Sequence, residues 1–450
     1  MNSTVIAEGT RTVTHLGTYL EELKSQSLNL AGRISAAERG FYLPSEEEAI
    51  RAVLISYWQS RSALLEVIQT CRAEPKDDED HPLVFLVAFS AALLLIDGAR
   101  FLKDNFHEHL HLRRMLNLAA PEFGIPAGTY DTVQQSLLQT RNAWHMYHAI
   151  EYFKQNESKL RKLANGNTFS PLLEIIDRLK LRVDVSFSQY ATAKLRVRTD
   201  QLIQKLNRGI LKRSLYGLQK IGAGMMADKY VRPGHRPNLP QGIQQQIESL
   251  IKPGDILAVR KEYAITNYFL PGYWPHVALY LGDAKARQSI GIDQHETVQS
   301  RWSQLMPQSK DSADRVLESK KDGVLIRSLS SPWESDSIVV LRPQLERHYI
   351  AEALTRALVH EGKPYDFDFD FTRSDRLVCT EVVYRSYQGI GDIEFPLSRR
   401  AGRVTLAGRD LIAMGTRRQH FDPILVYAPS HDERLIQGPS TLQLITKLED

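Results

Sequence analysis

The sequence predicts an α+β protein in which an all-helical N-terminal domain precedes an α+β domain with a small antiparallel sheet. Apolar residues recur at helical spacing over much of residues 45–225, and short β-rich runs follow a Pro- and Gly-rich stretch. At 450 residues the chain is long enough for two or three domains. We expect a helical domain over 1–229, a linker over 230–242, an α+β domain over 243–430 and a polar tail over 431–450.

The first clear helix signal lies at Pro44 and Ser45. A cluster of glutamates follows them, which places acids at the positive end of a helix dipole. Apolar residues then repeat at steps of three and four. Further helices are expected over 82–104, 131–164 and 170–222.

The composition favours a cytoplasmic protein without a transmembrane helix. The longest apolar run, "LVFLVAFSAALLLI" at 83–96, is shorter than the roughly 20 residues that span a bilayer, so we expect a buried central helix. The first 23 residues lack a basic start and an apolar core, so we expect no signal peptide. Two distant cysteines, Cys71 and Cys379, fit a reducing compartment. The net charge of +4 gives no reason to expect nucleic acid as a partner.

A basic stretch over 178–220 is the one strong charge feature of the helical half. Lysines and arginines recur from Arg178 to Lys220, opposed by Asp184 and Asp200. Such a face could contact an anionic membrane surface, which would make the protein membrane-associated, or could simply be solvated.

Beyond the linker the pattern changes to short β-rich runs separated by turns. These runs are "GDILAVR", "HVALYLG", "GVLIRSL" and "DSIVVLRP". Two helices are expected after them, over 345–361 and 379–388. The polar segment 299–322 is expected to be a loop or a helical insertion near the cleft.

A cysteine and a histidine of this domain suggest nucleophilic catalysis. Cys379 lies in the first turn of the predicted helix "CTEVVYRSY", where the helix N-terminus favours a thiolate. His276 opens the strand "HVALYLGD" and could take the thiol proton. The next β-like piece, "DQHETVQS", carries His295 and Glu296, and either could orient the imidazole if this piece pairs with the His276 strand. Strand alternation allows only one of them to face the site.

Four motifs in this order resemble a known family. "PGDILAVR", "HVALYLGD", "GKPYDFDFDF" and "VCTEVVYRSY" are similar to the permuted papain-like amidases of the YiiX/YebB type, a circularly permuted branch of the NlpC-type cysteine peptidase superfamily. Lecithin–retinol acyltransferase has a related permuted fold. Histidine precedes cysteine here, as in the permuted branch. The resemblance covers roughly residues 250–390 and leaves the helical half without an interpretation.

The resemblance implies roles for individual residues. Cys379 corresponds to the nucleophile and His276 to the general base, with Ala278 where the family commonly has glycine. Glu296 falls where the family has its third polar residue, so it is favoured over His295. Tyr365 resembles a tyrosine that precedes the nucleophile, and its hydroxyl could stabilise an oxyanion beside the Cys379 amide.

Three functions follow as hypotheses. The preferred one is a cysteine hydrolase or acyltransferase that acts on a peptide, an amide or a lipid-like acyl substrate through an acyl-enzyme. The second keeps the same site and assigns it to peptidoglycan stem peptides. The third is a non-catalytic scaffold that binds a membrane or protein, in which Cys379 would be buried and distant from His276.

No cofactor and no metal are expected. The acids of "YDFDFDF" alternate with aromatic residues, so we expect Asp366, Asp368 and Asp370 to point away from the packed face.

Overall fold

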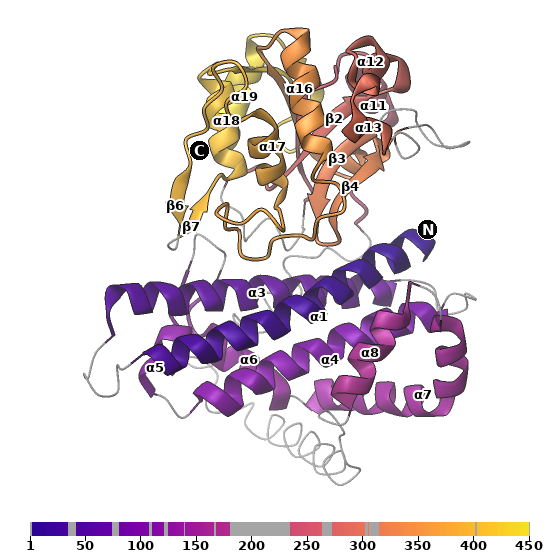
Figure 1. Ribbon diagram of the computed structural model, residues 1–450, viewed down its shortest axis with the longest axis vertical. Coiled ribbons are helices and arrows are strands. Elements are labelled where there is room, and N and C mark those ends of the chain that lie inside the picture. Colours follow the sequence, from indigo (N-terminus) through magenta and orange to yellow (C-terminus); the bar gives the residue numbers. More distant parts are fainter. Residues whose placement is uncertain are drawn as a thin grey trace, which may run out of the picture. The chain divides into compact units, whose positions relative to one another are not determined.

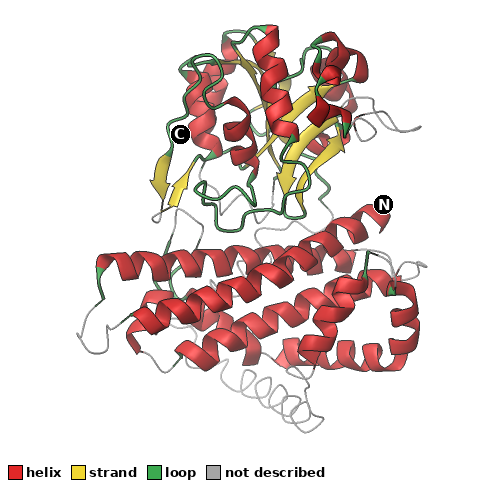
Figure 2. Cartoon of the chain, in the orientation of Figure 1, coloured by secondary structure: helices red, strands yellow, loops and turns green. Residues whose placement is uncertain are grey.

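The computed structural model describes two compact units, one helical and one built on a sheet (Figures 1 and 2). The first unit comprises Met1–Pro121 and Ile125–Tyr230, and the second comprises Glu122–Gly124 and Val231–Asp450. The structure describes residues 2–34, 42–73, 81–107, 110–120, 125–138, 140–165, 168–180, 235–262, 272–301, 305, 315–400 and 403–449. The two units are described separately below.

The described part of the first unit is helical throughout, as its apolar periodicity predicts (Figure 2). Its helices are α1 (Asn2–Arg33), α3 (Pro44–Ala73), α4 (His81–Phe106), α5 (Leu110–Leu116), α6 (Thr129–Leu138), α7 (Thr140–Ala164) and α8 (Ser170–Leu179). The helix expected to begin at Pro44 begins there. The single helix expected over 131–164 is replaced by α6 and α7.

Helix α4 is the centre of this unit, since it contacts α1, α3, α6, α7 and α8. Among the described residues, one helix is long and apolar enough to cross a membrane, Pro82–Phe106, and 67% of its apolar window is buried inside the protein. Asp97, on the same helix, is buried against Lys24 of α1. The expectation of a buried central helix is therefore confirmed.

Most of the basic stretch 178–220 lies outside the described residues. Its first members, Arg178 and Lys180, are described, and each forms ion pairs with acids of the helical unit. The surface role proposed for this stretch stays a prediction.

The second unit is built on a seven-stranded antiparallel sheet with the order β4-β3-β2-β1-β5-β8-β9. The strands are β1 (Ile256–Arg260), β2 (His276–Gly282), β3 (Arg315–Lys320), β4 (Gly323–Ser328), β5 (Ser337–Pro343), β8 (Phe421–Ala428) and β9 (Asp432–Gln437). A separate pair joins β6 (Ser398–Arg400) and β7 (Arg403–Thr405). The α+β class and the antiparallel sheet are confirmed, and the main sheet is larger than expected.

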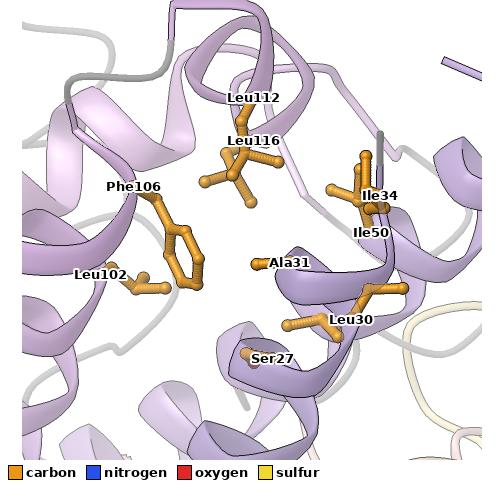
Figure 3. Close-up of a pocket in the computed structure, with 10 residues that line it drawn as sticks. Ser27, Leu30, Ala31, Ile34, Ile50, Leu102, Phe106, Leu112 and Leu116 are labelled. Atoms are coloured by element: carbon orange, nitrogen blue, oxygen red, sulfur yellow. The ribbon is translucent and has the colours of Figure 1, made fainter. Parts of the chain in front are cut away.

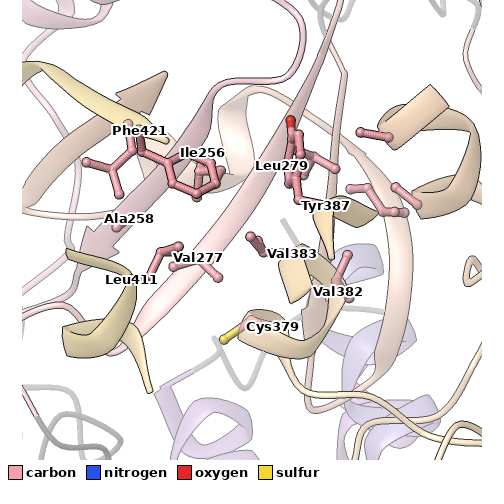
Figure 4. Close-up of a cluster of buried hydrophobic side chains, with 14 of the residues drawn as sticks. Ile256, Ala258, Val277, Leu279, Cys379, Val382, Val383, Tyr387, Leu411 and Phe421 are labelled. Atoms are coloured by element: carbon pink, nitrogen blue, oxygen red, sulfur yellow. The ribbon is translucent and has the colours of Figure 1, made fainter. Parts of the chain in front are cut away.

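Both faces of the main sheet are covered, because its strands are apolar on both sides. On β2, Val277 and Leu279 enter one core, whereas Ala278 and Tyr280 enter the other, as the two-residue period of a strand requires. The first core, shown in Figure 4, also contains residues of α16 (Arg347–Leu358), α17 (Cys379–Tyr387), α18 (Gly408–Thr416) and α19 (Ser440–Glu449). The second contains residues of α11 (Gln241–Glu248) and α15 (Ser330–Trp333).

Three short elements complete this unit. They are α12 (Ala284–Ser289), η5 (Ile292–Gln294) and α13 (Glu296–Gln299).

The expectation of a polar C-terminal tail is wrong. Residues 432–437 form β9, which pairs with β8 at the edge of the sheet, and α19 follows it. Ile445 and Leu448 of α19 are buried in the first core. Their spacing of three places both on one face of the helix, and the polar residues that make up most of the remaining positions account for the error.

The linker expected over 230–242 is only partly described. Residues 235–240 have no regular structure, and Leu239 is buried in the second core with its N–H bonded to the carbonyl of Trp333. Its last two residues, 241 and 242, already belong to α11.

Candidate active site

Cys379 is the first residue of α17, as the sequence predicts. Val378 is the N-cap in extended conformation, and the Cys379 side chain is buried, with 5% of its surface exposed. Figure 4 shows Cys379 at the edge of the apolar cluster, with its sulfur directed away from Val382 and Val383. The thiol therefore lies at the start of a helix, where unpaired backbone N–H groups favour negative charge.

The chain just before Cys379 is held by hydrogen bonds at Leu377. The Leu377 carbonyl accepts from Ser319 Oγ at 2.6 Å and from the Asp366 N–H at 3.2 Å, while its own N–H donates to the Pro364 carbonyl at 3.0 Å. Ser319 belongs to β3, so these bonds fix the start of α17 relative to the sheet. Leu377 is two residues from the thiol, and small movements there would displace Cys379.

His276 is the first residue of β2 and approaches Cys379 from the sheet. Its side chain is hydrogen-bonded to Cys379, and its Nε2 lies 2.7 Å from Glu318 Oε2 on β3. The exposed fraction of the His276 side chain is 24%, whereas the Glu318 side chain is fully buried. Because Nε2 faces Glu318, Nδ1 is the nitrogen left for the thiol.

The register of β2 and β3 explains the contact between His276 and Glu318. Ala278 is paired directly with Glu318, and His276 lies two residues before Ala278 on the same face of the strand. Diagonal neighbours on one face lie within reach of long side chains. The carboxylate of Glu318 can therefore extend along the sheet to the imidazole.

Buried Glu318 is surrounded by hydrogen-bond donors and cations. Ser331 Oγ donates to its Oε1, and Lys320 Nζ and Arg327 Nε each lie 3.2 Å from the same oxygen. Burial by itself would raise the pKa of Glu318, but Lys320, His276 and Arg327 outweigh burial and hold that pKa well below its usual range. Glu318 is thus a permanent negative charge behind the imidazole.

That charge changes the protonation of His276. Burial alone would lower the pKa of His276, but hydrogen bonds and charge from Cys379 and Glu318 raise it from 6.5 to about 9. At neutral pH the arrangement therefore favours an imidazolium beside the Glu318 carboxylate.

The predicted third residue, Glu296, is not brought to this site. The piece "DQHETVQS" is not a strand: it forms η5 and α13, with His295 as the N-cap and Glu296 as the first residue of α13. Both side chains are exposed, and the described partners of His276 are Cys379 and Glu318. The strand beside β2 is β3 instead, within the segment expected to be a loop or insertion.

A signal for Glu318 was nevertheless present in the sequence. Lys321 and Asp322 separate the run "RVLESK" from the run "GVLIRS", which begins with Gly323, and an Asp-Gly pair at the junction of two β-rich runs is a hairpin signal. Gly323 has φ 105°, in the region that glycine tolerates best, and β3 pairs with β4 across this turn.

Tyr365 lies beside the nucleophile segment through its backbone. It forms a parallel bridge with Leu377, and its ring packs edge-on against Phe367 with centroids 5.0 Å apart. This position is compatible with the predicted support role.

The expectation that the acids near Tyr365 point away from the packed face is wrong. Asp366 is fully buried and Asp368 is 8% exposed. The Asp366 carboxylate accepts the backbone N–H groups of Asp368 and Asp370 at 2.9 and 2.8 Å, so it organises a tight loop instead of pointing outward. Burial, with the charge of Asp368, raises the pKa of Asp366 to about 7.

Glu381, in the first turn of α17, is also buried. Burial raises its pKa to about 8, against the opposing effect of Arg385 and with a further rise from Asp366. Arg385 pairs with Glu381 at 2.6 Å and donates to the carbonyls of Phe371 and Arg373, so α17 anchors the loop that leads to Cys379. Among the residues that the structure describes, no three His, Cys, Asp or Glu side chains are grouped to hold a metal.

Comparison with known proteins found one match. Residues 250–418 match the model of a family described as permuted papain-like amidase enzyme, YaeF/YiiX, C92 family. No curated protein and no solved structure matches the chain.

Proposed function

We propose that this chain is a cysteine hydrolase of the permuted papain-like amidase family, whose model matches residues 250–418, and that it cleaves amide or ester bonds with Cys379, His276 and Glu318. The observation that supports this most directly is the chain of contacts from thiol to imidazole to buried carboxylate. The scaffold hypothesis required Cys379 to be distant from His276, and the hydrogen bond between them argues against it.

In the first proposed half-reaction, the Cys379 thiolate attacks the carbonyl carbon of the substrate. The negative oxygen of the tetrahedral intermediate would be stabilised by the Cys379 backbone N–H at the helix start, and we place the Tyr365 hydroxyl as a second donor. The His276 imidazolium gives its proton to the leaving nitrogen or oxygen as the C–N or C–O bond breaks. An acyl thioester on Cys379 and a neutral His276 remain.

In the second half-reaction, His276 takes a proton from water, and the hydroxide oxygen attacks the thioester carbonyl. The C–S bond breaks, the acid leaves, and the thiolate–imidazolium pair is restored. Another alcohol or amine in place of water would give acyl transfer. Throughout, Glu318 holds the imidazole by its Nε2–H and stabilises its positive charge.

The experiment is hydrolysis of p-nitrophenyl acetate by the purified chain. We expect a burst of p-nitrophenol equal to the enzyme concentration, followed by slower turnover, with acetylation of Cys379 seen by mass spectrometry. Cys379→Ala should abolish both, whereas Cys71→Ala, which changes the other buried cysteine, should keep both. Equal burst and turnover in a folded Cys379→Ala variant would show that the mechanism is wrong.

A further inference from the structure

The helical unit contains an apolar cavity between α1, α3, α4 and α5. Its interior volume is about 40 Å³, several times the roughly 10–15 Å³ that a single water needs by the same measure. Figure 3 shows the lining side chains directed toward a common space, with Ala31 of α1 facing Phe106 of α4.

The chemistry of the lining is uniform. No polar atom is accessible from the cavity, and the one polar residue at its wall, Ser27, donates its hydroxyl to the Leu23 carbonyl at 2.6 Å. The deep wall is formed by side chains that are almost fully buried, among them Ile50 and Leu116. Water inside would have no hydrogen-bond partner on the protein, so filling the cavity with carbon is favourable.

Two small residues create the space. Ser27 and Ala31 lie four residues apart on α1 and therefore share one face, whereas the neighbouring lining positions of α1 are the larger Leu30 and Ile34. Ala31 is exposed, so the cavity is open on its side. The space is reached from solvent and its inner wall is aliphatic.

The helices that line the cavity end in charges of both signs. Arg33 and Arg113 are in the last turns of α1 and α5, while Glu47 is in the first turn of α3. The lining itself carries no charge, so the carbon chain is the part of a ligand that the cavity selects.

We propose that this cavity binds a single alkyl chain, as found in a fatty acid or in one tail of a lipid. A flexible, unbranched chain suits an aliphatic wall without polar groups, whereas a polar or hydrogen-bonding ligand would lose its solvation without compensation. The proposal concerns the helical unit alone and does not rest on the hydrolase assignment.

The experiment is calorimetric titration of the full chain with sodium hexanoate, octanoate, decanoate and dodecanoate, each below its micelle concentration. Burial of each added CH₂ should tighten binding roughly fourfold until the cavity is full. A parallel titration with lauroyl lysophosphatidylcholine distinguishes the two sources of an alkyl chain. Tighter binding than that of dodecanoate indicates a lipid tail, and weaker binding indicates a free fatty acid. Absence of saturable binding by all of these probes would overturn the proposal.

Variants on α1 test the location. Ala31→Phe fills the mouth and should weaken dodecanoate binding at least tenfold. Asn29→Phe adds the same ring at an exposed position on the other side of α1 and should change binding less than twofold. Cys379→Ala should bind as the wild type does, which separates this test from that of the hydrolase. Equal binding by folded Ala31→Phe and wild type would refute the cavity as the site.

A second readout does not depend on a variant that folds. A diazirine-bearing fatty acid should cross-link on irradiation to peptides that contain residues 27–34 or 102–116, and excess dodecanoate should suppress the cross-link. Cross-links confined to other peptides, or insensitive to dodecanoate, would contradict the proposal.

Discussion

Neutralising Glu318 is the sharpest test of the proposed site. Glu318→Gln keeps the size of the side chain and removes the charge that faces His276 Nε2 at 2.7 Å. A hydrogen bond to a charged group contributes about 1.5–3 kcal/mol, and about 1.4 kcal/mol corresponds to a factor of ten, so the equilibrium constant between the imidazolium–thiolate pair and the neutral pair should shift toward the neutral pair by about 10- to 150-fold. The pKa of His276, raised to about 9 with this carboxylate present, should fall.

The assay is the rate of Cys379 alkylation by iodoacetamide at pH 6, followed by mass spectrometry of the peptide that contains Cys379. In the wild type His276 is protonated at this pH and should support a reactive thiolate, whereas Glu318→Gln should react more slowly, by up to about 150-fold. Glu296→Gln is the matched control, because Glu296 is the carboxylate that the sequence alone favoured. Wild-type reactivity in folded Glu318→Gln, or a loss confined to Glu296→Gln, would refute the reasoning.

Three further predictions concern the supports of the site. Ser319→Ala removes the hydroxyl that donates to the Leu377 carbonyl at 2.6 Å. We expect the free energy of unfolding in urea to fall by about 1 kcal/mol and the turnover of p-nitrophenyl acetate to slow. Unchanged turnover would argue against a positioning role for Ser319. Burial raises the pKa of Glu381 to about 8, so the folded state retains a proton that the unfolded state loses near 4.5; stability from this group should decline as pH rises from about 4.5 to 8. Glu381→Gln should reduce that decline in urea titrations at pH 5 and 8.5, and an identical slope would contradict the assignment. Gly408→Ala places a methyl group against the carbonyl of Trp274, which lies two residues before His276. This clash should lower the melting temperature by several degrees. An unchanged melting temperature would show that the contact relaxes without cost.

Much of the architecture follows from short-range pattern. The helix from Pro44, the buried helix around 83–96, the strand that His276 opens and the helix that Cys379 begins are all present as predicted. Each of these elements was predicted from the spacing of apolar residues, from charges that complement a helix dipole or from turn residues. These signals act within a few residues of the chain.

The identity of the third residue depends on strand register, which short-range pattern does not specify. Glu296 is close to His276 in sequence and was favoured by motif order, yet 42 residues separate His276 from Glu318, which reaches it through the pairing of β2 with β3. The burial of two acidic residues also depends on contacts between segments that are distant in the sequence. Asp366 was expected to point away from the packed face, and only packing of the loop against α17 encloses it together with Glu381.

By itself, the sequence determined where the two groups of the proposed site lie, a thiol at a helix start and an imidazole at a strand start, because those positions are set by local backbone preferences. The tertiary structure decided which carboxylate holds the imidazole, which acids lose contact with water, and that the last 20 residues close the sheet instead of forming a tail. Those outcomes depend on long-range pairing, whose free energy comes from burial and register and is not written in any short stretch of residues.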